Sequence, residues 1–241
     1  IEGIIATHPF DSDQGTARLR RHLTDPENAH ASYAISATAA LPFLKHRDRE
    51  HLLELARNHQ SPEVRLEAAW AMARLKVPGA ENKLADATLD WRVGHRAVEY
   101  MEELGLQELV PAEALTPRRI ARATMADWLA HPNELGTTPD MLTIIDHREL
   151  LWPAVGKREA QTLLHWKHNG DEGVCWTGSA TWTLFSEAKA DQPILDLYAM
   201  YHSWHMAAEN HPGAPDSFTE IEAGRSMLTN ANPGQDWSPK P

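Results

Sequence analysis

The sequence is short of the residues and segments that several classes of protein require. Cys175 is its single cysteine in 241 residues, which excludes an internal disulfide and is typical of a reducing compartment. No apolar run approaches the roughly 18 residues that a membrane helix needs, and the N-terminal residues show no signal-peptide core. We therefore expect a cytoplasmic protein that does not insert into a membrane. Because the chain begins at Ile1 and not at methionine, an earlier removal of a leader or longer N-terminus stays open.

Basic residues are also scarce. The chain has 23 Lys and Arg against 34 Asp and Glu, a formal net charge of −11. The imbalance is larger in the second half, where residues 121–241 hold 8 basic and 16 acidic side chains. Such a surface repels phosphate backbones. We therefore expect no nucleic-acid partner.

Several catalytic and cofactor-binding motifs are missing. The chain has no HExxH metal motif and neither of the glycine-rich phosphate-binding patterns GxxxxGK and GxGxxG. Ser179 lies in TGSAT and not in the GxSxG turn of serine hydrolases. From these absences we predict no catalytic residue, no metal ligand and no cofactor.

Residues 61–75 have the signature of an amphipathic helix with a defined start. Ser61 is a good N-cap, Pro62 suits the first helical position, and Glu63 lies near the positive end of the helix dipole. The apolar residues recur at helical spacing on one face: Val64, Ala68, Met72 and Leu75. Such a helix cannot bury its apolar face alone, and therefore needs a neighbour.

Similar helices recur along the first half of the chain. Residues 50–59 form the first helix of a hairpin that turns at Ser61-Pro62. The pattern returns at 80–89 and 90–105, with Asp90 in the cap position and Val93 matching Val64 at an offset of 29 residues. Two further pairs are predicted at 16–44, turning at Asp25-Pro26, and at 107–130, turning at Thr116-Pro117. The sequence therefore predicts about four helical hairpins over residues 14–130.

The stretch HLLELARNHQSPEVRLEAAWAMARL resembles a HEAT-like repeat of the short variety also found in phycobilisome lyases. The matching features are the leucine-rich first helix, the polar-Pro turn, the Val64-Arg65 pair and the following Ala-Ala. In the next repeat Val93 is followed by Gly94 in place of arginine. The resemblance covers about half the chain and implies an α-solenoid. It also implies that Arg65 is structural and braces adjacent turns.

The second half changes character after the connector at 131–140. Residues 174–185, VCWTGSATWTLF, alternate with a period of two and predict a strand with one buried face and one polar face. Residues 158–168 also have an extended pattern, and the intervening NGDEG is strong turn chemistry, which together predict a β-hairpin near 158–185. Residues 141–152 are the candidate for a third strand.

Two helices are predicted to complete this half, near 193–209 and 218–228, the second opened by the capping box SFTE at 217–220. The fold class is therefore mostly α: an α-solenoid of about four HEAT-like hairpins over 14–130, followed by a small α+β domain over 141–229 with a short antiparallel sheet. The tail, 230–241, has no periodicity and is either an ordered strap or loose; Trp237 favours packing.

The candidate binding residues are all in the second half: Trp176, Trp182, His202 and His205. Both tryptophans are expected on one face of the sheet, and both histidines lie three apart on one helix. A second histidine pair, His165 and His168, lies near the hairpin turn, and the two pairs together with Cys175 could form a zinc site. The simpler explanation is that the tryptophans are core residues and that close histidine pairs arise by chance among 14 histidines. A lone cysteine on a strand is likewise more often inert than nucleophilic.

Three functions follow from different features. The first is a non-enzymatic scaffold that binds another protein, of undefined oligomeric state, and it predicts an exposed apolar or acidic groove along the repeats. The second is an enzyme or cofactor-handling protein; bilin-lyase-like chemistry is implied by the resemblance alone, and an enzyme predicts a pocket with convergent titratable groups. The third is a small-molecule or metal-binding module, which predicts a cavity lined by the candidate residues.

Overall fold

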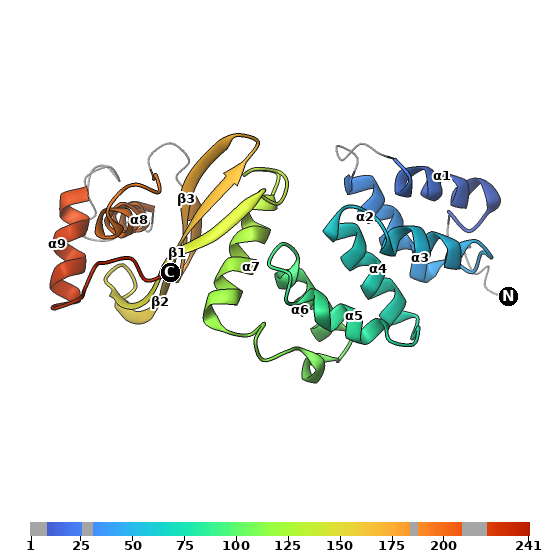
Figure 1. Cartoon of the computed structure of the whole chain (residues 1–241), viewed down its shortest axis with the longest axis horizontal. Coiled ribbons are helices and arrows are strands. Elements are labelled where there is room, and N and C mark those ends of the chain that lie inside the picture. Colours follow the sequence, from blue (N-terminus) through green and yellow to red (C-terminus); the bar gives the residue numbers. More distant parts are fainter. Residues whose placement is uncertain (1–8, 26–30, 184–187, 209–220) are drawn as a thin grey trace, which may run out of the picture. The chain divides into compact units, whose positions relative to one another are not determined.

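The computed structural model describes residues 9–25, 31–183, 188–208 and 221–241 (Figure 1). The α-helices are α1 (Asp13–Leu23), α2 (Ala31–Ala40), α3 (Arg49–Arg57), α4 (Pro62–Arg74), α5 (Ala80–Ala87), α6 (Gly94–Glu103), α7 (Pro117–Ala130), α8 (Ile194–Ala208) and α9 (Ile221–Ala231). Two short 3₁₀ helices are η2 (Leu41–Phe43) and η3 (Gln107–Leu109). The strands are β1 (Met141–Trp152), β2 (Lys157–His168), β3 (Asp171–Thr177) and β4 (Thr181–Thr183). Within these ranges, every helix is too short or too polar to cross a membrane.

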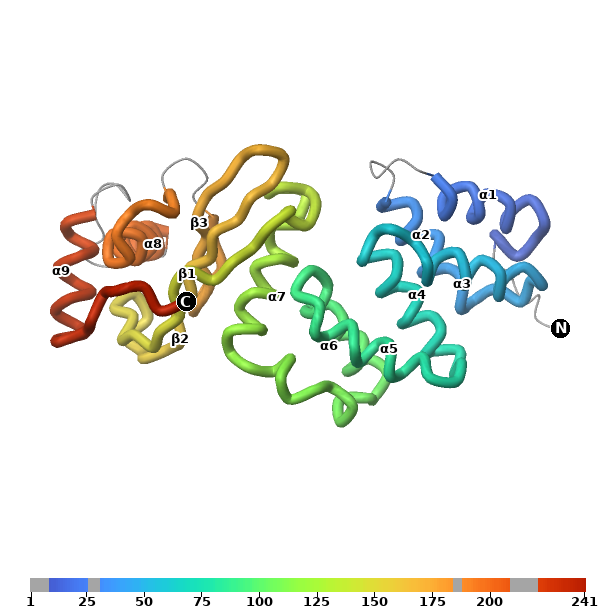
Figure 2. Tube along the Cα trace, in the orientation of Figure 1, coloured from blue at the N-terminus to red at the C-terminus, as the bar shows by residue number. Residues whose placement is uncertain are grey.

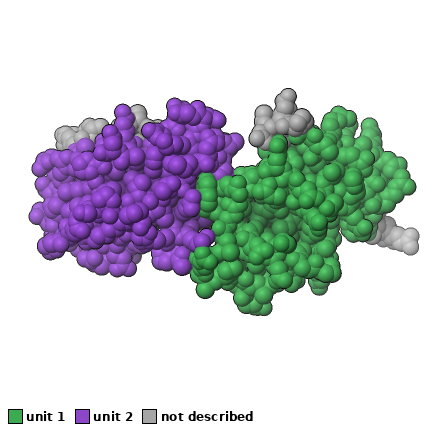
Figure 3. Space-filling model, in the orientation of Figure 1, with its two compact units in different colours: residues 1–115 green, residues 116–241 purple. Residues whose placement is uncertain are grey.

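The chain divides into two compact units, Ile1–Leu115 and Thr116–Pro241 (Figure 3). Helices α1–α6 belong to the first unit; α7, the sheet, α8 and α9 belong to the second. The predicted repeat segment, 14–130, included residues 117–130 as its last helix. In the structure this helix is α7 and contacts β1, β2 and β3. The boundary between the units therefore lies at 115–116, before the connector at 131–140 where the composition changes.

The first unit consists of helix pairs in chain order (Figure 2). Contacts join α1 to α2, α3 to α4 and α5 to α6, and further contacts join α2 to α4 and α4 to α5. The helices predicted at 50–59, 61–75 and 80–89 are present as α3, α4 and α5. The buried faces of these helices and of α6 are rich in alanine and other aliphatic residues, including Leu52, Ala56, Val64, Ala68, Leu84 and Ala97. Small side chains allow these helices to approach closely.

The helix starts at Ser61-Pro62 and Thr116-Pro117 agree with the sequence, whereas the start expected at Asp90 differs. Ser61 is the N-cap of α4, and its Oγ accepts a hydrogen bond of 3.2 Å from the Val64 N–H. The prediction that Asp90 caps the next helix is wrong, because α6 begins after Val93. Asp90 instead accepts from the Arg92 N–H at 3.1 Å, which closes a turn of its own. Pro26 and the capping box at 217–220 lie outside the described residues.

The second unit is built on an antiparallel sheet in the order β1-β2-β3-β4. The third strand predicted at 141–152 is present as β1. The hairpin between β2 and β3 turns at Asn169 and Gly170, whose φ angles are 51° and 92°. Two consecutive positive φ angles are what a tight two-residue hairpin of this kind requires, and Asn-Gly is the sequence best suited to them.

The single strand predicted over 174–185 is wrong. The chain reverses after β3, where the Gly178 N–H donates to the Ala180 carbonyl at 2.8 Å, and β4 returns alongside β3. A Cβ at position 178 would lie 1.9 Å from Oε1 of the buried Gln161, so any larger residue here would have to displace the Gln161 side chain. Trp176 and Trp182 pair directly across the two strands and stay on one face, because the reversal preserves the alternation.

Helices cover both faces of the sheet, which lies between α7 and α8 (Figure 1). Trp176 stacks with Tyr201 of α8 at 5.9 Å between ring centroids. The opposite face, which the alternation marked as polar, is also closed: Cys175 on that face is fully buried. The residues of β3 alone did not predict this burial. The large apolar side chains on this face belong to β2 and are Leu164 and Trp166.

The segment after α9 is ordered and returns to β1 (Figure 2). The His147 N–H donates to the Lys240 carbonyl at 3.0 Å. Trp237 packs against the core of this unit, with its ring 6.2 Å from that of Tyr198. Of the two alternatives for the tail, the strap is therefore the one observed.

Candidate functional site

The first unit has a groove of about 650 Å³ along α3, α4, α5 and the turn before α6. Its apolar lining comes from several small or flexible side chains: Pro62, Leu66, Ala69, Met72, Pro78, Ala80, Ala87 and Val93. Its charged lining consists of Arg57, Arg65, Lys83, Asp86 and Asp90. An apolar floor with charged groups at the edge suits a surface that buries apolar side chains of a ligand.

The local sequence explains why the groove is open. Gly79 precedes α5 with a φ of 78°, a left-handed conformation that glycine adopts without strain, and nothing lies within 4 Å of where its Cβ would be. Pro78 and Gly79 therefore form a low edge beside the alanines of α4 and α5. Lys83 and Asp86 stand at the rim, with 3.8 Å between their charged groups and most of each side chain exposed.

Arg65 lines the groove and holds the turn that precedes α4. Its Nη1 donates to the carbonyl oxygens of His59 and Gln60, each at 2.7 Å, in the turn that precedes α4. Its charge also acts on Asp90 of the next helix pair. Burial opposes ionisation of Asp90, but hydrogen bonds from Arg92 at 2.9 and 2.6 Å, with the charges of Arg92 and Arg65, hold its pKa below the ordinary value. The hydrogen bonds of Arg65 therefore hold the turn between α3 and α4, and its charge helps to keep Asp90 ionised.

The four binding residues predicted from the sequence gather in the second unit. Trp176 of β3 and Trp182 of β4 are 5.4 Å apart between centroids, and His205 of α8 lies 4.7 Å from Trp182. His202 reaches the same cluster through Trp152, at 5.1 Å. Trp152, which no sequence pattern singled out, stacks on Trp176 with 5.0 Å between ring centroids.

These rings pack directly on one another. Trp176 and His202 have no exposed surface, and His205 is 4% exposed. The Trp152 indole N–H donates to Nδ1 of His205 at 3.0 Å, which places the proton of a neutral His205 on Nε2. Trp182, at the edge of the cluster, is partly exposed. Among the described residues, the cluster is thus an aromatic core with a partly exposed edge that includes Trp182.

The other histidines and the cysteine do not converge. His165 lies 3.1 Å from Glu172, and Nε2 of His168 lies 3.1 Å from the Thr137 hydroxyl. Within the described ranges there is no group of three His, Cys, Asp or Glu side chains that could hold a metal ion. The Cys175 thiol donates to the Leu164 carbonyl at 3.3 Å, and burial raises its pKa well above the ordinary value, so it is protonated and unreactive.

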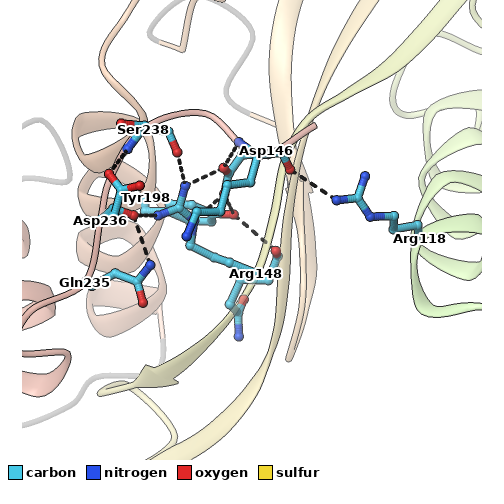
Figure 4. A network of polar contacts seen from close by, with 9 residues as sticks. Arg118, Asp146, Arg148, Tyr198, Gln235, Asp236 and Ser238 are labelled. Carbon is cyan, nitrogen blue, oxygen red and sulfur yellow. Dashed lines mark hydrogen bonds and ion pairs between the residues drawn. The ribbon is translucent and has the colours of Figure 1, made fainter.

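A buried polar network that the sequence analysis missed holds the strap on β1 (Figure 4). Asp146 and Arg148 form an ion pair, with Nε to Oδ2 at 2.6 Å, and their side chains are 0% and 3% exposed. The Tyr198 hydroxyl donates to Asp146 Oδ2 at 2.8 Å. Burial and the Asp146 carboxylate raise the pKa of Tyr198, which keeps it a donor. A detectable signal was the Asp and Arg two residues apart, because strand residues at that spacing share a face.

Comparison of the chain with family models, curated proteins and solved structures gave no match. The geometry of these sites therefore carries the functional argument.

Proposed function

We propose that this protein is a non-enzymatic interaction scaffold that binds another protein in the groove of its first unit. In this proposal α1–α6 form a short α-solenoid of HEAT-like hairpins. The proposal rests mainly on the groove, because an exposed apolar groove along the repeats is the feature that a scaffold requires. The hydrogen bonds from Arg65 to the turn before α4 are compatible with the structural role that the resemblance implies for this residue.

The charges around the groove favour binding over catalysis. A general acid or base needs a pKa near the working pH. Asp90 has a pKa below the ordinary value and is held by Arg92, so it stays ionised and occupied. The cations Arg57 and Lys83 instead suit a partner segment that brings acidic groups beside apolar ones.

Capture from an extract of the cells that make the protein tests this proposal. The full chain and two variants are immobilised, and the retained proteins are identified by mass spectrometry. Ala69→Arg fills the groove from α4, where Ala69 is partly exposed. Ala17→Arg is the matched control, because Ala17 is an exposed residue of α1 that does not line the groove.

We expect the same partner to bind the wild type and Ala17→Arg and to be lost from Ala69→Arg. Lys83→Glu, at the exposed rim, is a second groove variant in case Ala69→Arg fails to fold, and we expect it to reduce capture several-fold. Equal capture by the wild type and the groove variants would contradict the proposal.

The aromatic cluster supports a second candidate, a small-molecule module, through one observation: all four predicted residues meet there, with Trp182 accessible. A ligand that binds only the folded state raises the melting temperature. A saturable shift with planar aromatic compounds or with zinc, lost in Trp182→Ala, would favour this module over the scaffold.

A further inference from the structure

The strap, residues 232–240, lies on β1 in two steps. Asn232 comes first, and its side-chain amide takes the place of a neighbouring strand: Oδ1 accepts from the Leu151 N–H at 2.8 Å, and Nδ2 donates to the Leu151 carbonyl at 3.0 Å. Gly234 then turns the chain with a φ of 74°. The remaining residues, 236–240, cross the buried pair of Asp146 and Arg148 (Figure 4).

The protein recognises residues 236–240 almost wholly through their backbone. Arg148 donates to the carbonyls of Asp236 at 2.6 Å and Ser238 at 2.8 Å. The Lys240 N–H donates to Asp146 Oδ1 at 2.8 Å. The carbonyl of Lys240 accepts from the His147 N–H at 3.0 Å and from Arg118 at 3.4 Å. Carbonyls at alternate positions, 236, 238 and 240, face the same side, as they do in an extended chain.

One side chain of this segment adds to the recognition. The Trp237 ring lies 5.2 Å from the Arg148 guanidinium and 6.2 Å from the Tyr198 ring. Ser238 and Lys240 are exposed. Asp236 is used within the segment itself, since its Oδ1 accepts from the Ser238 N–H at 2.9 Å. A peptide with an extended backbone and a tryptophan at one position would therefore make most of the contacts that residues 236–240 make.

The groups that contact the strap come from elements outside it. Asp146 and Arg148 come from β1, and Tyr198 comes from α8. Tyr198 holds Asp146 and also donates to the Gln161 carbonyl of β2 at 3.1 Å. Strands β1 and β2 and helix α8 hold these groups through contacts that do not involve the strap, and groups held in this way lower the entropic cost of binding.

We propose that Asp146, Arg148, Tyr198 and Arg118 form a peptide-recognition site, filled in cis by residues 236–240, that accepts an extended tryptophan-bearing segment of another chain in trans. The cis segment competes with any such partner, because a tethered ligand has an effective concentration on the order of millimolar. Binding in trans therefore increases when the cis contact is weakened. The site lies in the second unit, so it does not depend on the groove proposed above.

Fluorescence anisotropy with a labelled synthetic peptide of residues 233–241, PGQDWSPKP, tests the proposal on the full chain. Trp237→Ala removes the ring that holds the cis segment, and Asp236→Ala, at an exposed residue, breaks the turn that shapes it. Trp128→Ala is the control for the loss of a tryptophan, since Trp128 lies on α7 with 37% of its surface exposed.

We expect saturable binding to Trp237→Ala and to Asp236→Ala, at least tenfold tighter than to the wild type or Trp128→Ala. Adding Arg118→Ala to Trp237→Ala should weaken binding several-fold. The peptide with alanine in place of its tryptophan should lose most of its affinity. The proposal is overturned if neither opened variant binds the peptide more tightly than the wild type does, or if the alanine peptide binds equally well.

Discussion

Glu67 is the most buried carboxyl group of the first unit among the described residues, with 3% of its surface exposed. It accepts a hydrogen bond from the Tyr100 hydroxyl and lies 3.5 Å from the Arg96 guanidinium. Burial raises its pKa from the ordinary value of 4.5, and the hydrogen bond from Tyr100 and the charge of Arg96 offset only part of this effect. The folded state therefore binds the Glu67 proton more tightly than the unfolded state does.

This residue predicts how stability changes with pH. Between the ordinary carboxyl pKa and the raised value, the folded chain holds more protons than the unfolded chain, so the contribution of Glu67 to the free energy of unfolding falls as pH rises. Glu67→Gln removes that contribution. We expect the variant to be more stable relative to the wild type at about pH 7 than at about pH 4, measured by urea denaturation.

The exposed Glu99 of α6 provides the control, because Glu99→Gln removes the same charge from the surface. A Glu67→Gln variant whose stability relative to the wild type does not change with pH would contradict the prediction.

At the scale of elements, α8 and α9 pack closely where Gly224 of α9 meets α8. A Cβ at position 224 would lie 2.4 Å from the Ala199 carbonyl oxygen and 2.7 Å from the Ser203 hydroxyl. The first of these is backbone and cannot move aside without shifting the helix. The close packing of this helix pair therefore depends on one glycine.

We expect Gly224→Ala to destabilise the protein. Alanine gains about 1 kcal/mol over glycine in a helix, whereas overpacking costs about 1–3 kcal/mol, and a backbone clash places this site at the upper end. Denaturant unfolding of Gly224→Ala and of Ser226→Ala, an exposed position on the same helix, measures the difference. A variant as stable as the wild type would show that the two helices can separate freely.

Local sequence patterns predicted those helices and strands that are determined by residues close together in the sequence. The cap and proline at Ser61-Pro62 set the start of α4, and the extended pattern of 158–168 indicated β2, with 141–152 as the candidate that became β1. The prediction of a single strand over 174–185 was wrong because apolar and polar residues alternate in the same way before and after the turn at Gly178. The alternation therefore does not reveal the turn. Asp90 failed as a cap because an Asx turn with Arg92 competes for the same residue.

At the scale of the whole molecule, the sites depend on contacts that no local pattern contains. Asp146 and Lys240 are 94 residues apart, and Trp152 and His205 are 53 residues apart. The aromatic cluster was found in advance only because its tryptophans and histidines are chemically conspicuous. The groove was expected from the repeats, but its lining depends on how α4 and α5 pack.

The two units have separate cores, each made of residues from one unit alone. Seven of the nine tryptophans lie in the second unit, so tryptophan fluorescence reports mainly on that unit, whereas far-ultraviolet circular dichroism reports on helices of both. Non-coincident transitions from two probes reveal unfolding that is not two-state. We expect circular dichroism to show two steps in denaturant, one of which coincides with the fluorescence change. Gly224→Ala should move that step alone; a single step shared by both probes would mean that the units unfold together.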